Sequence, residues 1–127
     1  MDYPVKPEKK ARKIEQRTVW LITSEGKLLL RRRANKGLLA GLWEFPNSLV
    51  GDEIELSLPY HEAKSCGTAT HIFSHIEWHM EGKSLSLPRC IPVPKDWRWV
   101  SAEELQQEIA LPSAFETFAS VYLKQKI

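Results

Sequence analysis

The distribution of apolar and polar residues predicts short strands over most of the chain and helices at its end. Thr18–Thr23 is rich in β-branched and aromatic residues, and an extended pattern resumes over Lys27–Arg33 after a turn that contains Gly26. Two such runs joined by a short glycine-containing connection are typical of a hairpin. Leu42–Phe45 predicts a further strand, which should end at Pro46 because proline has no N–H to donate to a sheet.

A second hairpin is predicted further along the chain. The pattern is extended over Thr68–Met80, with a break near Ser74, and a turn at Glu81–Gly82 leads into the extended run Lys83–Pro88. Trp97–Val100 predicts one more short strand.

Residues 47–66 give no clear prediction. Ile54, Leu56 and Leu58 recur with period two, as in a strand, but Pro59 and several acidic residues interrupt the pattern. The structure of this segment therefore stays open at the level of sequence.

The end of the chain predicts two helices. Ser101 followed by Glu104 matches a capping box, in which each side chain accepts a hydrogen bond from the backbone N–H of the other residue. A second helix should start near Pro112, because apolar residues then recur at a spacing that places them on one helical face. These residues are Phe115, Phe118, Ala119 and Tyr122. Strands followed by helices predict an α+β domain with a mixed sheet.

Length and composition fit one globular domain with a connector before it. The 127 residues can bury one core, and 43% of them are hydrophobic. Residues 1–17 hold two prolines and six Lys or Arg, which predicts an interdomain connector, with the folded domain over 18–127. No segment resembles a membrane span or a signal peptide, so we expect a cytoplasmic location. Cys66 and Cys90 lack metal-ligand spacing and are predicted to be free thiols.

The charges are unevenly placed although the net charge is only +2. A basic run without an intervening acid is followed by an acidic group. The run consists of Lys27, Arg31, Arg32, Arg33 and Lys36, and the acidic group of Asp52, Glu53, Glu55 and Glu62. This pattern predicts either a basic side suited to nucleic acid or simply a solvated strand face.

Residue combinations that support catalysis or metal binding are missing from the sequence. It contains no glycine-rich phosphate loop, no HExxH and no nucleophile elbow. His71, His75 and His79 are spaced by four and would share one face of a strand. Successive members would then be roughly 13 Å apart, too far to share an ion, so we predict no metal site.

The hairpin followed by GLLAGLWEFP resembles the opening of the Nudix fold. Hydrolases of that family carry a box of Gly, five residues, Glu, seven residues and Arg-Glu-apolar-x-Glu-Glu-x-Gly, whose glutamates hold divalent ions. None of the six glycines here has Glu six residues later, and no Arg-Glu pair exists. A Nudix-like fold without the box is therefore expected, and a Nudix pyrophosphatase becomes an unfavoured alternative.

Over nearly its whole length the chain resembles the C-terminal domain of adenine DNA glycosylases of the MutY family. The matching features are YPVKPEKK, TVWLIT with KLLLRRR, GLLAGLWEFP, HIFSH, and WVSAEEL with LPSAF, in this order. The family usually has a helix after LWEFP, where this sequence has SLVGDEIELSLPYHEA. This departure puts the local architecture in doubt.

The resemblance implies a role in base-excision repair. Such glycosylases are hydrolases of the N-glycosidic bond that excise adenine opposite 8-oxoguanine, and the appended domain inspects the oxidised base. The implied partners are duplex DNA with 8-oxoguanine:adenine or guanine:adenine mispairs and the N-terminal catalytic domain of the same polypeptide, within a bacterial nucleoid. The catalytic carboxylates and the 4Fe–4S cluster belong to that N-terminal region, so this fragment alone should have neither a cofactor nor glycosylase activity.

The resemblance also assigns the reading residues. Ser74 is implied to contact 8-oxoguanine, Phe73 to act as an apolar wedge beside the base step, and His75 and His71 to support the loop or touch the DNA backbone. Without the resemblance, Phe73 would be read as a core residue, Ser74 as a strand break and the histidines as surface groups. Trp43 is expected to fill the core. The alternative function is a Nudix-like protein-interaction module without DNA contact, in which Ser74 would be replaceable.

Overall fold

A computed structural model describes residues 12–125 as one mixed sheet with helices at the end of the chain. The sheet has seven strands in the order β3-β2-β1-β6-β5, with β4 paired to β1 and β7 paired to β2. The strands are β1 (Lys13–Ser24), β2 (Lys27–Arg32), β3 (Trp43–Glu44), β4 (Asn47–Leu49), β5 (Lys64–Ile72), β6 (Ile76–Ser86) and β7 (Trp97–Ser101). The helical elements are η2 (Tyr60–Glu62), α1 (Ala102–Gln107), η3 (Ser113–Phe115) and α2 (Glu116–Gln125). The predicted α+β class with a mixed sheet is confirmed.

Strand β1 is the centre of the sheet. It runs parallel to β6 over eleven residue pairs, from Lys13 opposite Ile76 to Thr23 opposite Ser86, whereas the other paired strands are antiparallel. Because β1 begins at Lys13, the strand includes Lys13–Arg17, which the sequence placed in the connector. The expected start of order near Thr18 was therefore too late; residues 1–11 lie outside the described part of the chain.

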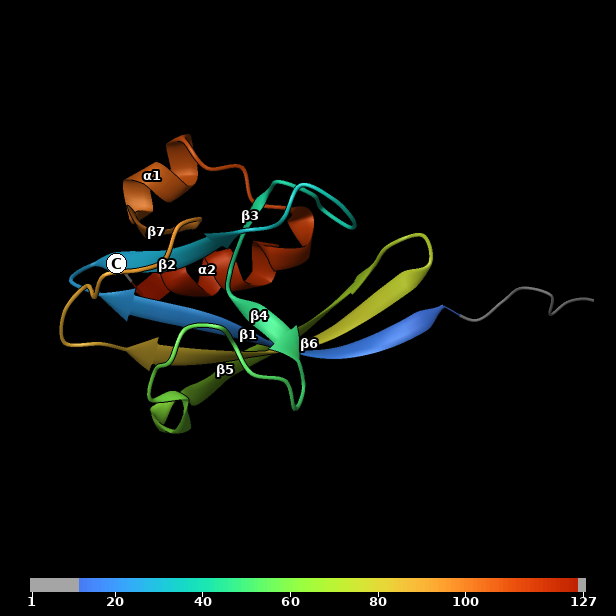
Figure 1. Cartoon of the computed structure of the whole chain (residues 1–127), viewed down its shortest axis with the longest axis horizontal. Helices are drawn as coiled ribbons and strands as arrows, with labels where there is room; N and C mark the ends of the chain where they lie inside the picture. The colour runs from blue at the N-terminus through green and yellow to red at the C-terminus, as the bar shows by residue number, and fades with distance from the viewer. Residues whose placement is uncertain (1–11, 126–127) are drawn as a thin grey trace, which may run out of the picture.

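Two apolar layers cover the two faces of the sheet. Neighbouring residues of a strand point to opposite faces, and Leu21 belongs to one buried cluster while Ile22 belongs to the other. Helix α2 covers the first face with Phe118 and Tyr122, as its i, i+3, i+4, i+7 spacing predicted. In Figure 1 this helix runs behind the sheet, and the segment after β4 crosses in front of it.

The predicted turn at Glu81–Gly82 is wrong. Strand β6 runs through both residues from Ile76 to Ser86, and the hairpin turn lies at residues 73–75 instead. Gly82 has a packing role here: a Cβ atom at this position would lie 2.5 Å from Cε1 of Phe118. The glycine lets α2 approach β6 closely, a tertiary requirement that looks like a turn signal in the sequence.

The segment that the sequence left open has little regular structure. Strand β3 ends at Glu44, before Pro46 as predicted, and a separate short strand, β4, follows at Asn47. The period-two residues Ile54, Leu56 and Leu58 form no strand. All three are partly buried against the second cluster, so their alternation reflects contact of an irregular segment with the sheet.

The end of the chain follows the prediction. Ser101 accepts a hydrogen bond from the Glu104 backbone, and the Glu104 carboxylate accepts one from the Ser101 backbone. A single 3-10 turn after Pro112 leads into α2. Cys66 and Cys90 are free thiols, as predicted.

Candidate nucleic-acid interface

The segment HIFSH forms the turn that joins β5 to β6 at one end of the sheet (Figure 1). The backbone N–H of Phe73 donates to the carbonyl of Ile76 at 2.7 Å, which closes the turn. The backbone N–H of Lys13 donates to the carbonyl of His75 at 3.1 Å. The turn is therefore fixed to β5 and β6 and also to the start of the central strand.

Phe73 lies between two aromatic rings. Its ring meets that of Trp78 edge-on, with centroids 4.9 Å apart, and that of His71 at 4.7 Å. Phe73 is only half-buried, although it packs against the first core cluster. One part of the ring is thus anchored to the core while the rest remains accessible at the turn.

Ser74 and His75 project from the tip of the turn and are both exposed. Within residues 12–125, neither side chain makes a hydrogen bond or an ion pair. The Ser74 hydroxyl can accept and donate, and so can a neutral imidazole ring. The turn therefore presents polar groups beside an accessible aromatic ring.

The structure does not place the three spaced histidines on one strand face. His71 ends near the turn on β5, His75 lies in the turn, and His79 is on β6 opposite Thr70. His79 bonds to Glu77 at 2.6 Å, and this hydrogen bond is the main reason that the pKa of the Glu77 carboxyl is below its usual value. His79 is therefore occupied on its own strand.

Trp78 links the turn to a group of arginines that the sequence did not single out as a unit. The guanidinium carbon of Arg17 lies 4.5 Å from the centroid of the Trp78 ring, and that of Arg33 lies 5.7 Å away. Trp78 is fully buried. The same indole therefore contacts Phe73 of the turn and two cationic side chains, each from a different part of the chain.

Glu44 holds Arg33 and a third arginine, Arg31, in place. Its side chain is 2% exposed and accepts from Arg31 at 2.8 Å and from Arg33 at 2.7 Å, while Asn47 donates to it at 2.9 Å. A buried carboxylate requires such partners because an unpaired charge is costly to desolvate. The sequence carries one signal of this role, a glutamate between large apolar residues in the predicted strand LWEF.

The residues of GLLAGLWEFP have mainly structural positions. Phe45 and Pro46 are buried, whereas Trp43 is half-buried and packs against the first cluster from outside, so it supports the core without filling it. Leu42 differs, with 41% of its surface exposed. It is nevertheless held by its backbone, whose carbonyl accepts from the N–H of Arg33.

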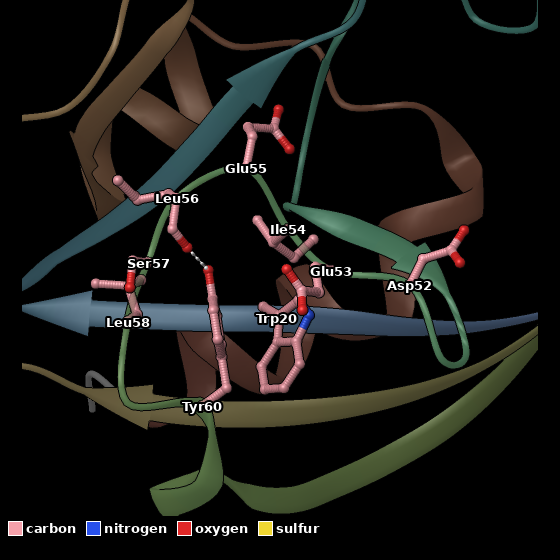
Figure 2. A pocket seen from close by; sticks show the side chains of 9 residues that line it. All are labelled: Trp20, Asp52, Glu53, Ile54, Glu55, Leu56, Ser57, Leu58 and Tyr60. Atoms are coloured by element: carbon pink, nitrogen blue, oxygen red, sulfur yellow. Dashed lines mark hydrogen bonds between the residues drawn. The ribbon is translucent and has the colours of Figure 1, made fainter.

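A hollow lies on the face of the sheet that carries the second apolar cluster, between the sheet and the irregular segment after β4 (Figure 2). It encloses about 620 Å³ between that segment and the rings of Trp20 and Tyr60. The Tyr60 hydroxyl donates to the Leu56 carbonyl, and its burial, reinforced by Glu55, raises the pKa of Tyr60 to about 12. Three acidic residues line this hollow: Asp52, Glu53 and Glu55. Their negative charge makes this hollow unsuited to a polyanion such as nucleic acid.

Comparison with known sequences identifies two kinds of relatives. The sequence model of the NUDIX domain matches residues 18–120. Human adenine DNA glycosylase is 29% identical over an alignment that covers 99% of this chain and 27% of that protein. The rat adenine DNA glycosylase is 31% identical over 75% of this chain and 22% of its own length. The chain thus spans about a quarter of the length of these relatives.

Solved structures show the same fold. The C-terminal domain of mouse MUTYH, solved in complex with human PCNA, has a TM-score of 0.66 and 23% identity, covering 88% of this chain and 89% of that one. A MutT protein from Methanosarcina mazei has a TM-score of 0.67 and 18% identity, covering 91% and 96%. Among the helices of residues 12–125, none is long and apolar enough to cross a membrane.

Proposed function

This chain belongs to the NUDIX domain family, and from that premise we propose that it is the lesion-reading domain of an adenine DNA glycosylase, which inspects 8-oxoguanine opposite adenine. The similarity to human adenine DNA glycosylase covers 99% of the chain and supports this family of activities. The observation that carries the proposal is the β5–β6 turn, where accessible Phe73 lies beside exposed Ser74.

The chemistry of the oxidised base fits the groups of this turn. Guanine presents acceptors at N7 and O6 in the major groove, whereas 8-oxoguanine carries a hydrogen at N7 and a carbonyl at C8. A reader must therefore supply an acceptor and a donor. The Ser74 hydroxyl can accept from N7–H while the Ser74 backbone N–H donates to the new carbonyl.

The other residues of the turn have supporting roles in this proposal. Phe73 inserts its accessible edge beside the base step, because an apolar wedge stabilises a locally unstacked duplex. His75, exposed at the tip, contacts the sugar-phosphate backbone. His71, half-buried against Phe73, positions that ring and has no direct DNA contact.

Excision itself is assigned to another part of the polypeptide. The sequence lacks the Nudix glutamates, and the chain covers only about a quarter of the related glycosylases. We therefore expect the catalytic carboxylates and the 4Fe–4S cluster in a separate N-terminal region. By itself the chain should bind DNA without cleaving an N-glycosidic bond or a nucleoside diphosphate.

The proposal is tested by NMR titration of the ¹⁵N-labelled chain with matched duplexes, a method that detects weak binding. The duplexes carry 8-oxoguanine or guanine opposite adenine at one fixed salt concentration, because affinity for DNA depends on salt. Shifts of Phe73–His75 that are larger for the oxidised duplex support lesion reading. Equal shifts with both duplexes, or shifts confined to other residues, would contradict it.

A protein-interaction module is the second candidate function. Exposed Ile14 and Ile72 both lie opposite Glu77 across neighbouring strands, so they lie on one open face of the sheet. The mouse MUTYH C-terminal domain was solved in complex with a protein, human PCNA. If the chain has this second function, addition of DNA causes no NMR shifts at residues 73–75. Ile72→Asp then weakens binding of the protein partner, whereas Ser74→Ala does not.

A further inference from the structure

A second hollow is lined mainly by basic residues and is connected through Trp78 to the turn at residues 73–75, here called the reading turn. It encloses about 300 Å³ and is lined by five basic side chains and two carboxylates. Two of its basic residues, Arg17 and Arg33, lie over the ring of Trp78. The same ring meets that of Phe73 edge-on. The hollow is therefore linked to the turn through Arg17, Arg33 and the buried indole of Trp78.

Three of the basic residues are already engaged. Arg31 and Arg33 donate to Glu44, and Arg31 also reaches Glu55 at 3.1 Å. Arg17 donates to Glu15 at 2.8 Å and to Asn47 at 2.7 Å. These contacts fix the guanidinium groups but also compensate most of their charge.

Arg32 and Lys36 are different. Both are exposed, and within the described range 12–125 neither side chain has a hydrogen bond or an ion pair. The backbone of Arg32 is nevertheless fixed, since its N–H donates to the Asp96 carbonyl at 2.7 Å. The hollow thus has two uncompensated cations, and a backbone hydrogen bond fixes the position of one of them, Arg32.

We propose that this hollow binds a backbone phosphate of the duplex, with Arg32 and Lys36 as the contacting groups, and so sets the register of the DNA on the reading turn. The inference rests on the proposed function and adds a site that positions the duplex without reading its sequence. Phosphate contacts fix orientation, whereas base contacts carry specificity. The two tasks are thereby divided between neighbouring parts of one surface.

The lining of the hollow favours a duplex phosphate over a free nucleotide. A nucleotide site normally offers an apolar or aromatic surface to the base, but the only uncharged residue that lines this hollow is Ala34. A backbone phosphate needs only cationic donors, and long flexible Arg and Lys side chains at an open rim suit it.

The test is the salt dependence of DNA binding. Arg32→Gln with Lys36→Gln is compared with the wild-type chain by fluorescence anisotropy of a labelled duplex, over about 50 to 200 mM salt. Loss of this one phosphate contact should reduce the slope of log K against log salt by about 0.9 in the double variant. The ratio of affinities for oxidised and unoxidised duplexes should stay unchanged.

Lys27→Gln with Arg89→Gln is the matched control. It removes the same two types of exposed charge, but Lys27 lies at the β1–β2 turn and Arg89 precedes Cys90, whose N–H donates to Glu25 of that turn. This is the opposite end of β1 from the reading turn. The control should keep the wild-type slope; an equal loss in both variants, or no loss in the Arg32 and Lys36 variant, would overturn the proposal.

Two further measurements separate the possible outcomes. Titration with a free deoxynucleoside triphosphate or inorganic phosphate at constant ionic strength should not saturate the Arg32 side-chain resonance; if it does so while the duplex does not, the site serves a free anion and the proposal fails. Ser74→Ala should leave the slope unchanged. A shallower slope for the double variant without any lesion preference would retain the phosphate site and reject lesion reading.

Discussion

The ring of Phe73 meets the buried indole of Trp78 edge-on, at a centroid distance of 4.9 Å and an interplanar angle of 71°. Such edge-to-face pairs contribute beyond their buried area, and here the pair fixes an accessible ring at the end of a hairpin. Phe73→Ala should therefore lower the free energy of unfolding by about 1–3 kcal/mol, less than for a fully buried phenylalanine. It should also weaken duplex binding.

The neighbouring residue provides the control for this substitution. Ile72 is 52% exposed, so Ile72→Ala should change stability by less than about 1 kcal/mol. Urea denaturation gives both stability values, and the NMR titration gives binding. If the two variants bound duplex DNA equally well, Phe73 would have no special role at the interface.

Ser74→Ala should change discrimination without changing the fold. The residue is exposed and its side chain has no partner within residues 12–125, so its loss leaves the core intact. The variant should lose about 1–3 kcal/mol of preference for 8-oxoguanine over guanine, because the hydroxyl acceptor is removed. Competition binding with the two duplexes measures the difference. An unchanged preference would exclude the assigned role of the hydroxyl.

Glu44→Gln should be among the most destabilising single changes. It removes the buried charge that Arg31 and Arg33 share, which leaves Arg33 without a carboxylate partner and Arg31 with only the exposed Glu55. Loss of one member of a buried ion pair typically costs about 3–5 kcal/mol.

Glu55→Gln removes the second carboxylate that contacts Arg31, and this carboxylate lies at the surface. The Glu55 side chain is 58% exposed, so solvent screens the pair with Arg31 and the cost should be below about 1 kcal/mol. Chemical denaturation of both variants compares them directly. Similar losses would show that burial does not set the strength of these ion pairs.

Gly82→Ala should destabilise the chain although alanine is small. The new Cβ would lie 2.5 Å from Cε1 and 2.8 Å from Cδ1 of Phe118, so either α2 or β6 must move. Overpacking of this kind typically costs about 1–3 kcal/mol. The double variant Gly82→Ala with Phe118→Leu should lose less stability than the sum of the losses of the two single variants. Additive losses would argue against this contact.

The Tyr60 hydroxyl should lose its proton at a higher pH than an ordinary tyrosine. Burial, and secondly Glu55, raise its pKa from 10.0 to about 12. Because the unfolded chain loses this proton first as the pH rises, the contribution to folding stability is constant below about pH 10 and is lost as the pH rises through 12. Tyrosinate absorbance against pH should show a late step that Tyr60→Phe removes. A wild-type curve with no such step would contradict the buried position.

Elements whose signals are local in the chain could be predicted from the sequence. The capping box of Ser101 and Glu104 and the apolar face of α2 are visible in the sequence because a helix brings residues three and four apart together. The motif HIFSH likewise predicted Ser74 as the break in an extended run. In the structure this break is the tip of the β5–β6 turn, where the exposed Ser74 needs no partner from another part of the chain.

Features that depend on residues far apart in the chain became visible only in the folded structure. Gly82 was mistaken for a turn residue because the ring that requires it, Phe118, belongs to a helix that packs across β6 only in the folded chain. Parallel pairing of β1 with β6 has no local signal, and it also moved the start of the sheet back to Lys13. The same holds for Trp78, which lies between Phe73 and two arginines. Arg17 comes from β1, Arg33 follows the end of β2 and Phe73 belongs to the turn, and only folding brings them onto one ring.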